Sequence, residues 1–449
     1  MSDTTATDTA ASVARQPGSR LGDRLRTLRV AAGLTQSELA GDRFSKEYVS
    51  QIERGKTRPT RETIEWLAQR LGVDPGFLAS GVSTDERGKL EAALARAEAL
   101  AQAHRYDEAI ETFAQARDTV AGTGSAELEL RVLTGLAWAT MQAGDARGAI
   151  ELLTAARSLA EGPQFSDVDR ADVIFRAGVC RYKLSSIATA TALLDEALSL
   201  AERSGLPCDL LRADILGWRS RCRRRQRDLE AAREDVERAL ELAQAMEDRR
   251  TIANTYYQAS LVAERMGHWL LSRNYAEQAK VLYQELADER NVGKLLTNLG
   301  GLNLMLGNPG QAIEHLKASF SVALEVDSRE DAAQAAGSLA TVHLHLGDFD
   351  AAEEHARHAL ELLEGREDYL HETGPTQLVL GRAMLERDRL DEAEQWFHAA
   401  DATFEQMSSV SHRASAWVAL GDLSARRGDM AEAARLYRHA AEALQDVRF

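Results

Sequence analysis

Two segments near the start of the chain carry apolar residues at helical spacing. The first set comprises Leu21, Leu25, Leu28 and Ala32, and the second comprises Ile64, Leu67, Ala68 and Leu71. Each set falls on one face of a helix. The pattern predicts two amphipathic helices whose apolar faces close into one small all-helical core.

A shorter helix is predicted between these two. Thr35 followed by Glu38 has the spacing of a capping box, in which each residue bonds the backbone of the other. The helix therefore begins at about Gln36, with the next apolar pair, Leu39 and Ala40, facing inward.

A further helix follows a short turn. Ser45 can cap a helix over residues 45–53 whose buried side is Val49 and Ile52, and Gly55 ends it. Two short helices a few residues apart, the second with polar side chains on its outer face, are typical of a helix-turn-helix that lays one helix in the major groove of DNA.

At these residues the chain resembles the XRE-type helix-turn-helix regulators, relatives of the phage repressors. The matching pieces, in order, are a first helix ending LRVAAGLTQ, then ELA, then YVSQIERG, then Pro59, and ETIEWLAQRLGV before Asp74-Pro75. The resemblance implies a five-helix DNA-binding domain over residues 20–80. Residues 1–19 are predicted to be a disordered tail, and residues 81–88 a linker.

The outward positions of the second central helix are the candidate reading residues. Lys46 can donate to guanine and Glu47 can accept from cytosine, which are patterns that the major groove distinguishes. The full set of candidate DNA contacts is Gln36, Ser45, Lys46, Glu47, Tyr48, Ser50, Gln51, Arg54, Lys56 and Arg58. The resemblance implies that Gln36 and the start of the second central helix have roles similar to those of the matching positions in phage repressors. It also implies that Glu53 pairs with Arg29. The alternative is a helical interaction module that has lost DNA binding.

An internal repeat fills the rest of the chain. A small residue recurs at 109, 149, 190, 232, 272, 312, 352, 393 and 433, a spacing of 40 to 42 residues. Another small residue stands twelve positions before each, from Ala97 to Gly421, and a turn signal such as LGDFDAA lies between most pairs. Each unit is predicted to be two helices joined by a tight turn, with small residues where the helices cross.

This pattern resembles the tetratricopeptide repeat, although the usual unit is shorter, at about 34 residues. Nine such units over residues 89–449 would stack into a right-handed α-solenoid whose first helices line a concave groove. The expected fold class is all-α. Another two-helix repeat of similar length would show the same spacing.

The repeat register places one polar and aromatic set toward this groove. The candidate ligand-binding residues are Tyr182, Arg221, Arg224, Asn254, Tyr257, Gln258, Lys294 and Asn298. Amide side chains can pair with the backbone of an extended peptide, and cations with its carboxylate. The alternative for the basic run at residues 218–227 is a solvated helix face neutralised by acidic neighbours.

Charge divides the chain into two parts. The net charge is −16, yet residues 20–80 hold 11 Lys/Arg against 8 Asp/Glu, and residues 81–449 hold 42 against 60. A basic head on an acidic body is consistent with the head alone meeting phosphates. The N-terminus lacks the order of a secretory signal and no run of 18 apolar residues occurs, so a cytoplasmic protein without membrane association is expected.

Other chemistry has little support in the sequence. The cysteines Cys180, Cys208 and Cys222 lack metal or redox spacing, and the clustered histidines between His343 and His358 offer too few ligands on one face for a metal. No phosphate loop, nucleophile elbow or zinc-protease motif occurs. We therefore predict neither an enzyme nor a bound metal or cofactor.

Together these patterns predict a homodimeric, DNA-binding transcription regulator whose repeats bind a peptide or other effector. The layout resembles the peptide-sensing regulators grouped as RRNPP, a likeness of architecture that implies quorum sensing. The alternative is a scaffold whose repeats recruit a protein partner to DNA without a small effector.

Overall fold

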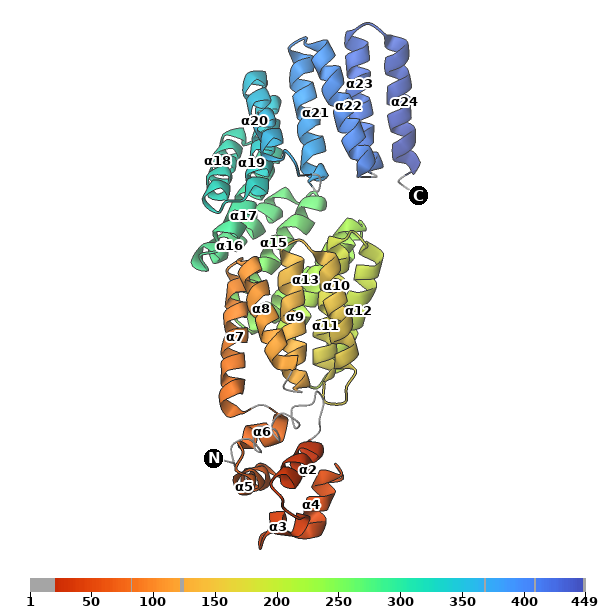
Figure 1. Ribbon diagram of the computed structural model, residues 1–449. Coiled ribbons are helices and arrows are strands. Elements are labelled where there is room, and N and C mark those ends of the chain that lie inside the picture. Colours follow the sequence, from red (N-terminus) through yellow and green to blue (C-terminus); the bar gives the residue numbers. More distant parts are fainter. Residues whose placement is uncertain (1–20, 82, 122–124, 367–368, 408, 447–449) are drawn as a thin grey trace. The chain divides into compact units, whose positions relative to one another are not determined.

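The computed structural model describes residues 21–81, 83–121, 125–366, 369–407 and 409–446 (Figure 1). Helices joined by turns make up this described part, which contains no strand and confirms the all-α prediction. The predicted disordered tail, residues 1–19, lies outside the described residues. None of the described helices is both long and apolar enough to cross a membrane.

The head is built from five helices around one core. They are α2 (Leu21–Ala31), α3 (Gln36–Ala40), α4 (Lys46–Glu53), α5 (Arg61–Leu71) and α6 (Pro75–Ser80). The Thr35–Glu38 capping box is present, and the Ser45 hydroxyl accepts from the backbone of Tyr48. Val49 and Ile52 are buried as predicted, whereas Ala32 lies beyond the end of α2 and is exposed.

The predicted linker is too long. Helix α7 (Thr84–Gln102) begins inside the span 81–88 because Ser83 and Glu86 form a second capping box. The S-x-x-E spacing that specifies this cap is present in the sequence, within the stretch that the prediction assigned to a break in the pattern.

The body consists of helices in alternating first and second positions. The first helices are α7, α9 (Ala126–Gln142), α11 (Asp167–Lys183), α13 (Asp209–Arg225), α15 (Arg249–Arg265), α17 (Glu289–Met305), α19 (Arg329–Leu346), α21 (Leu370–Glu386) and α23 (Val410–Arg426). The second helices are α8 (Tyr106–Ala121), α10 (Ala146–Ala160), α12 (Ile187–Arg203), α14 (Leu229–Ala245), α16 (Trp269–Glu285), α18 (Pro309–Glu325), α20 (Phe349–Leu362), α22 (Leu390–Gln406) and α24 (Met430–Asp446). Most are 17 residues long, which accounts for a unit near 40 residues.

The small residues of the repeat lie where the prediction places them. The eight recurring alanines of the later position are 0–2% exposed, and Ser272 is fully buried. The earlier small position is equally closed, because a Cβ built on Gly300 would lie 2.5 Å from the side chain of Leu316 in the partner helix. Close crossing of paired helices therefore requires these residues.

In every repeat, one residue with left-handed backbone conformation lies in the turn between the two helices. The positions are His104, Gly144, Ser185, Arg227, Gly267, Gly307, Gly347, Asp388 and Gly428, with φ between +57° and +107°. A single left-handed residue after a helix ends it and redirects the chain. The turn therefore recurs with the same 40- to 42-residue spacing as the small residues.

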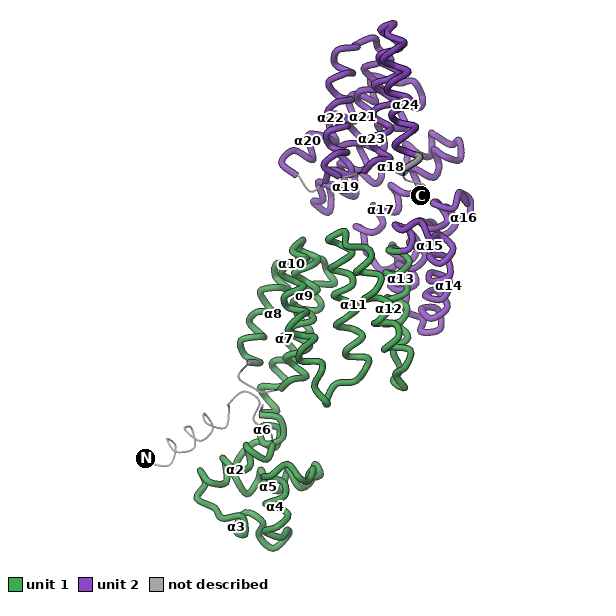
Figure 2. Tube along the Cα trace, turned by 90° about the vertical axis from the view of Figure 1, so that its right-hand side faces the viewer, with its two compact units in different colours: residues 1–222 green, residues 223–449 purple. Residues whose placement is uncertain are grey.

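The chain divides into two compact units, residues 1–222 and 223–449 (Figure 2). Within each unit, first helices touch the next first helix: α7 with α9 and α9 with α11 in one, α17 with α19, α19 with α21 and α21 with α23 in the other. No described second helix contacts the next second helix as closely. Along α7–α11 in one unit and α17–α23 in the other, the first helices therefore form the inner layer.

Candidate functional site

Helix α4 is held against α2 by a buried ion pair. The guanidinium of Arg29 donates to both carboxylate oxygens of Glu53, at 2.6 and 3.2 Å, and to the carbonyl of Leu34 at 2.8 Å. The side chains of Arg29 and Glu53 are only 12% and 4% exposed. The pairing implied by the family resemblance is thus present, and its two-pronged geometry fixes the direction of α4.

The turn between α3 and α4 is fixed from α5. Phe44 in the turn packs edge-on against Trp66, with ring centroids 5.1 Å apart. Arg70 lies over the Trp66 ring and donates to the carbonyl of Glu38 at 2.8 Å. Gly41 ends α3 with φ +55°, and a Cβ there would lie 2.8 Å from the Arg70 guanidinium. The orientation of α4 thus depends on contacts between residues that are distant in sequence.

Most candidate DNA contacts lie open to solvent. Exposed residues are Ser45, Lys46, Glu47, Gln51, Arg54, Lys56 and Arg58, and half-buried residues are Gln36, Tyr48 and Ser50. Three of them also have structural partners. The Ser45 hydroxyl caps α4, Tyr48 packs on Phe44 with centroids 5.3 Å apart, and the Gln36 amide donates to Glu53 at 2.8 Å.

The join between head and repeats uses side chains that the sequence prediction missed. The Asp74 carboxylate accepts from the backbone of Phe77 in α6 and from the backbone of Thr84 in α7, each at 2.9 Å. These and further hydrogen bonds lower the pKa of Asp74 despite the opposing effect of burial, which is the largest single influence. One carboxylate therefore caps both helices. The Asp74-Pro75 pair in the sequence is typical of the first cap and gives no sign of the second.

The candidate ligand residues of the second unit lie on first helices, as predicted. Asn254, Tyr257 and Gln258 belong to α15, and Lys294 and Asn298 to α17. Two of these amides already have partners, because Asn254 accepts from the Tyr283 hydroxyl and Asn298 bridges Ser260 and Glu264 at 3.0 Å each. Gln258 is 4% exposed, so the prediction that it faces an open groove is wrong.

The remaining candidates gather aromatic neighbours. The Tyr182 ring meets the edge of Trp218 at 5.5 Å, and the Arg221 guanidinium lies over the Trp218 ring at 4.1 Å. All three are half-buried on α11 and α13. Arg224, the other predicted ligand residue of α13, is also half-buried.

Two arginines of the basic run at residues 218–227 are neutralised by acidic neighbours, as the alternative interpretation predicted. Arg219 pairs with Asp195 at 2.7 Å, and Arg223 pairs with the buried Asp235 at 3.0 Å. Acidic second helices therefore supply counter-charges for these two arginines. The stacked Arg221 is different in kind, because its guanidinium rests on an indole.

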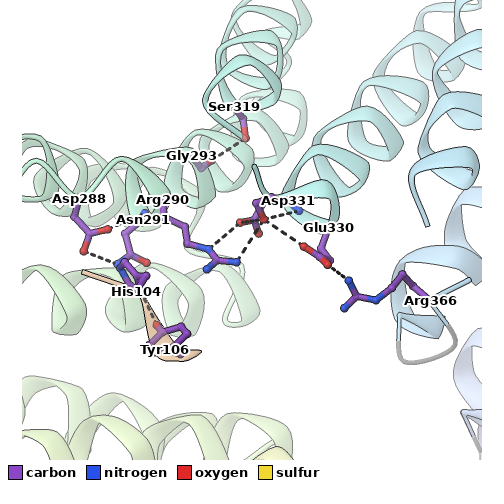
Figure 3. Close-up of polar contacts among 11 residues, drawn as sticks. His104, Tyr106, Asp288, Arg290, Asn291, Gly293, Ser319, Glu330, Asp331 and Arg366 are labelled. Atoms are coloured by element: carbon purple, nitrogen blue, oxygen red, sulfur yellow. Dashed lines mark hydrogen bonds and ion pairs between the residues drawn. The ribbon is translucent and has the colours of Figure 1, made fainter. Parts of the chain in front are cut away.

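A polar network links the starts of successive first helices in the second unit (Figure 3). Arg290 of α17 reaches Asp331 and Ser328 at 3.5 Å, and Glu330 pairs with Arg366. Beside this network the Gln334 amide donates to Glu372 at 3.0 Å. Burial raises the pKa of Glu372 to about 7. These contacts hold neighbouring repeats together.

The cysteines are buried free thiols, and burial raises the pKa of Cys180 to about 11. His343 and His355 stack with centroids 5.3 Å apart. Within the described part of the chain, no three His, Cys, Asp or Glu side chains gather as a metal site needs.

Comparison with known proteins also distinguishes a helix-turn-helix head from a body of repeats. Residues 20–80 match the helix-turn-helix domain family, and residues 291–365 and 331–400 match the tetratricopeptide repeat family. The chain is 46% identical over 54 residues to the HTH-type transcriptional regulator y4dJ of Sinorhizobium fredii, which is 12% of this chain and 70% of that protein. It is 41% identical over 64 residues, 14% of this chain, to DdrOP3 of Deinococcus deserti, and spans 50% of that regulator's length.

Solved structures share the fold of the longer body. The apo quorum sensor NprR of Bacillus thuringiensis superposes with a TM-score of 0.59 at 15% identity, over 80% of this chain and 99% of that one. A Rap protein complexed with Competence and Sporulation Factor gives 0.54 at 15% identity, over 78% and 99%.

The molecule is thus a helix-turn-helix protein that carries tetratricopeptide repeats. It belongs to the HTH-type transcriptional regulators, of the XRE type that the sequence predicted, and its body shares the fold of the solved structures above. That family agrees with the prediction that the chain is not an enzyme.

Proposed function

We propose that this protein is a sequence-specific DNA-binding regulator whose repeats bind an effector, dimerise and control the placement of the heads. The observation that supports DNA reading is the exposure of Lys46 and Glu47 on a helix whose other face is buried and whose direction the Arg29–Glu53 pair fixes. Such a helix can enter a major groove without rearrangement.

Selection from random DNA with the full chain tests the reading function. An enriched motif supports it, and no enrichment would overturn it. Lys46→Ala should relax preference at one base pair, because a good bidentate contact discriminates by about 1–3 kcal/mol.

Lys56→Ala serves as the matched control for Lys46→Ala. Lys56 is exposed beyond the end of α4, where a cation can hold a phosphate. Its loss should weaken binding to all sequences alike and lower the salt slope by about one unit. Loss of base preference in this variant instead would contradict the assigned roles.

Effector binding rests on the first helices of each unit and on the solved proteins of the same fold. NprR is a quorum sensor, and the Rap protein is complexed with Competence and Sporulation Factor. We propose a short peptide for this chain, because the first helices of each unit offer suitable groups. The first unit has Tyr182 and Arg221, and the second has Arg224, Asn254, Tyr257, Lys294 and Asn298.

Replacing Asn254 and Asn298 by Ala tests the role of these amides in the effector response. The double variant should lose the response of operator binding to an extract of the source cells and keep operator affinity without extract. Asn274→Ala, on the second helix α16, removes an exposed amide from the other layer and is the control. An unchanged response in the double variant would place the effector elsewhere.

A further inference from the structure

A cavity of about 250 Å³ lies between α10, α11 and α12, all of them in the first unit (green in Figure 2). Its walls are the two second helices α10 and α12, and its floor comes from the first half of α11. The cavity therefore belongs to the layer of second helices, and not to the inner layer. Sites for drug-sized ligands measure about 300–1,000 Å³, so this one suits a small metabolite. We call it the outer cavity.

A long loop makes room for the outer cavity. Six residues, 161–166, separate α10 from α11, whereas three residues join α14 to α15, α16 to α17 and α18 to α19. Each added residue extends the reach of a loop by up to about 3.3–3.6 Å, so the end of α10 and the start of α11 can stand apart. Arg170 spans this gap, because it donates to the carbonyl of Ala160 and to the carboxylate of Asp167, each at 3.0 Å. One end of the cavity is thus fixed before any ligand binds.

Charges of both signs line the outer cavity in equal number. They are three arginines and three carboxylates, namely Arg157, Arg170, Arg203, Glu161, Asp167 and Glu196. Arg170 pairs with Asp167 at 3.0 Å, and a second pair joins Arg157 to Glu196 at 2.9 Å. Glu161 and Arg203 are exposed, and neither side chain has an ion pair or hydrogen bond within the described part of the chain. The lining is neutral as a whole, and one carboxylate and one guanidinium remain to meet a ligand.

The two unpaired charges follow the paired ones along the same helices. Glu161 is the C-cap of α10, one turn after Arg157, and keeps a helical backbone with φ −67° and ψ −15°. On α12, Arg203 comes two turns after Glu196. Residues at such spacings lie on one face of a helix. The Arg157–Glu196 pair therefore bridges α10 and α12, and farther along the same walls a carboxylate and a guanidinium face the cavity without meeting.

Helix stability accounts for only one of these two charges. Arg203 lies in the last turn of α12, where the helix dipole favours a cation. Glu161 lies at the same end of α10, where the dipole disfavours an anion. Its carboxylate stabilises neither the helix nor a neighbouring residue, so the binding of a cationic group is the role that its position supports.

We propose that the outer cavity binds a free α-amino acid with a small apolar side chain, its ammonium group on Glu161 and its carboxylate on Arg203. Val173 and Ile174 of the floor are 1% and 4% exposed, and Leu200 of the wall is half-buried, so the apolar area offered is small. A zwitterion suits a neutral lining, whereas an anion or a cation alone would leave one of the two charges unmatched. The proposal goes beyond the proposed function and does not depend on it.

A bound amino acid would tie α10 to α12, as the Arg157–Glu196 pair already does. Each repeat contacts only its neighbours, so a ligand between two repeats sets their separation. The chain would then receive a small-molecule signal on the layer opposite the inner one.

Calorimetry with the full chain and L-valine tests the proposal. Valinamide lacks the carboxylate and N-acetylvaline lacks the ammonium group, so both are matched probes with the same side chain. L-Valine should bind, and each blocked analogue should bind about tenfold or more weakly, because one charged hydrogen bond is lost. Hydrogen exchange should slow at the carboxyl ends of α10 and α12 when L-valine is present.

Variants locate the site. Glu161→Gln and Arg203→Gln should each weaken the binding of L-valine by about tenfold or more. Both positions are exposed, so the circular dichroism of the parent should be kept. Arg147→Gln and Glu151→Gln are the matched controls, because each removes a charge from an exposed position of α10 that does not line the cavity.

Three results would overturn the proposal. They are no binding of L-valine, equal or tighter binding of either blocked analogue, and an affinity for L-valine that survives both Glu161→Gln and Arg203→Gln. The outer cavity takes no part in operator selection or in the response to a peptide. Failure here would therefore leave the proposed function standing, and failure of DNA reading would leave the outer cavity standing.

Discussion

At the scale of single residues, the head depends on a carboxylate that never needs to touch DNA. Glu53 receives the Arg29 guanidinium and the Gln36 amide in a site where its side chain is 4% exposed. Removing one partner of a buried pair costs about 3–5 kcal/mol, because the other charge is left without compensation. The direction of α4 and the position of Gln36 then both loosen.

Glu53→Ala should therefore destabilise the head by about that amount and weaken operator binding. Hydrogen exchange of amides in α2–α5 measures the opening of the head separately from the repeats. Arg61→Ala is the control, because its pair with Glu65 is largely exposed, and such pairs contribute about 0–1 kcal/mol. Exchange in Glu53→Ala as slow as in the parent would refute the role.

Glu372 gives the second unit a dependence on pH. Burial raises its pKa from the ordinary 4.5 to about 7, so the folded state disfavours the ionised form. The penalty is absent below pH 4.5, grows as the pH rises, and is complete above about pH 7, where it amounts to about 3 kcal/mol. Glu372→Gln should therefore match the parent at pH 4 and exceed its stability at pH 8.

The measurement for Glu372 is hydrogen exchange in α21 at several pH values, corrected for the intrinsic rate. Glu361→Gln, at an exposed position of α20, is the matched control and should follow the parent throughout. Equal stability of Glu372→Gln and the parent at pH 8 would show that Glu372 is ionised without cost.

At the scale of elements, two adjacent glycines of α17 allow the effect of packing on stability to be measured separately from the effect of helix propensity. A Cβ on Gly300 would lie 2.5 Å from Leu316, whereas a Cβ on Gly301 meets nothing within 4 Å. Gly301→Ala should stabilise the second unit by about 0.5–1 kcal/mol, because alanine favours the helix. Gly300→Ala should destabilise it by about 1–3 kcal/mol through overpacking. Urea unfolding compares the two, and destabilisation by Gly301→Ala would contradict this account.

Much of the element structure could be predicted because it is written in local patterns. Caps such as Thr35–Glu38 and the recurring small residues each act within one unit, and both lie where expected. The misses depend on long-range contacts. Trp138 directly follows the small residue Ala137, just as Arg221 directly follows Ser220, so the repeat register could have marked Trp138 as an inner-layer residue. Only the fold shows that Arg176 lies over the Trp138 ring.

At the scale of the whole molecule, the hydrogen bonds of Asp74 join the head to the first repeat. Asp74 caps α6 in the head and accepts from both the backbone and the hydroxyl of Thr84 at the start of α7. A ligand can shift the heads only by the difference in its affinity for two arrangements, typically about 1–3 kcal/mol. The hydrogen bonds of Asp74 to both helices provide a direct route by which such a difference can reach the head.

Thr84→Ala should therefore reduce the effect of effector on operator affinity while leaving the effector-free affinity near that of the parent. The hydroxyl bond is lost, at 3.3 Å, and the backbone bond remains, so folding should survive. Thr112→Ala is the control, because Thr112 is a half-buried threonine of α8 whose hydroxyl donates to a backbone carbonyl of the same helix. Gel-shift titration with and without effector measures the coupling, and coupling unchanged in Thr84→Ala would remove the joint from the mechanism.

We expect specific binding to require two heads that are paired by the repeats. One small module buries too little DNA surface for high specificity, so the heads of a homodimer should occupy half-sites about 10 bp apart or a multiple of that. Inserting about 5 bp between half-sites turns one of them to the opposite face of the duplex and should abolish tight binding, whereas inserting about 10 bp should restore much of it if the repeats allow the reach. Light scattering at micromolar concentration measures the mass with and without operator. A monomeric mass in both, or equal affinity for both spacings, would mean that each head binds alone and that the repeats act on DNA binding by some route other than pairing.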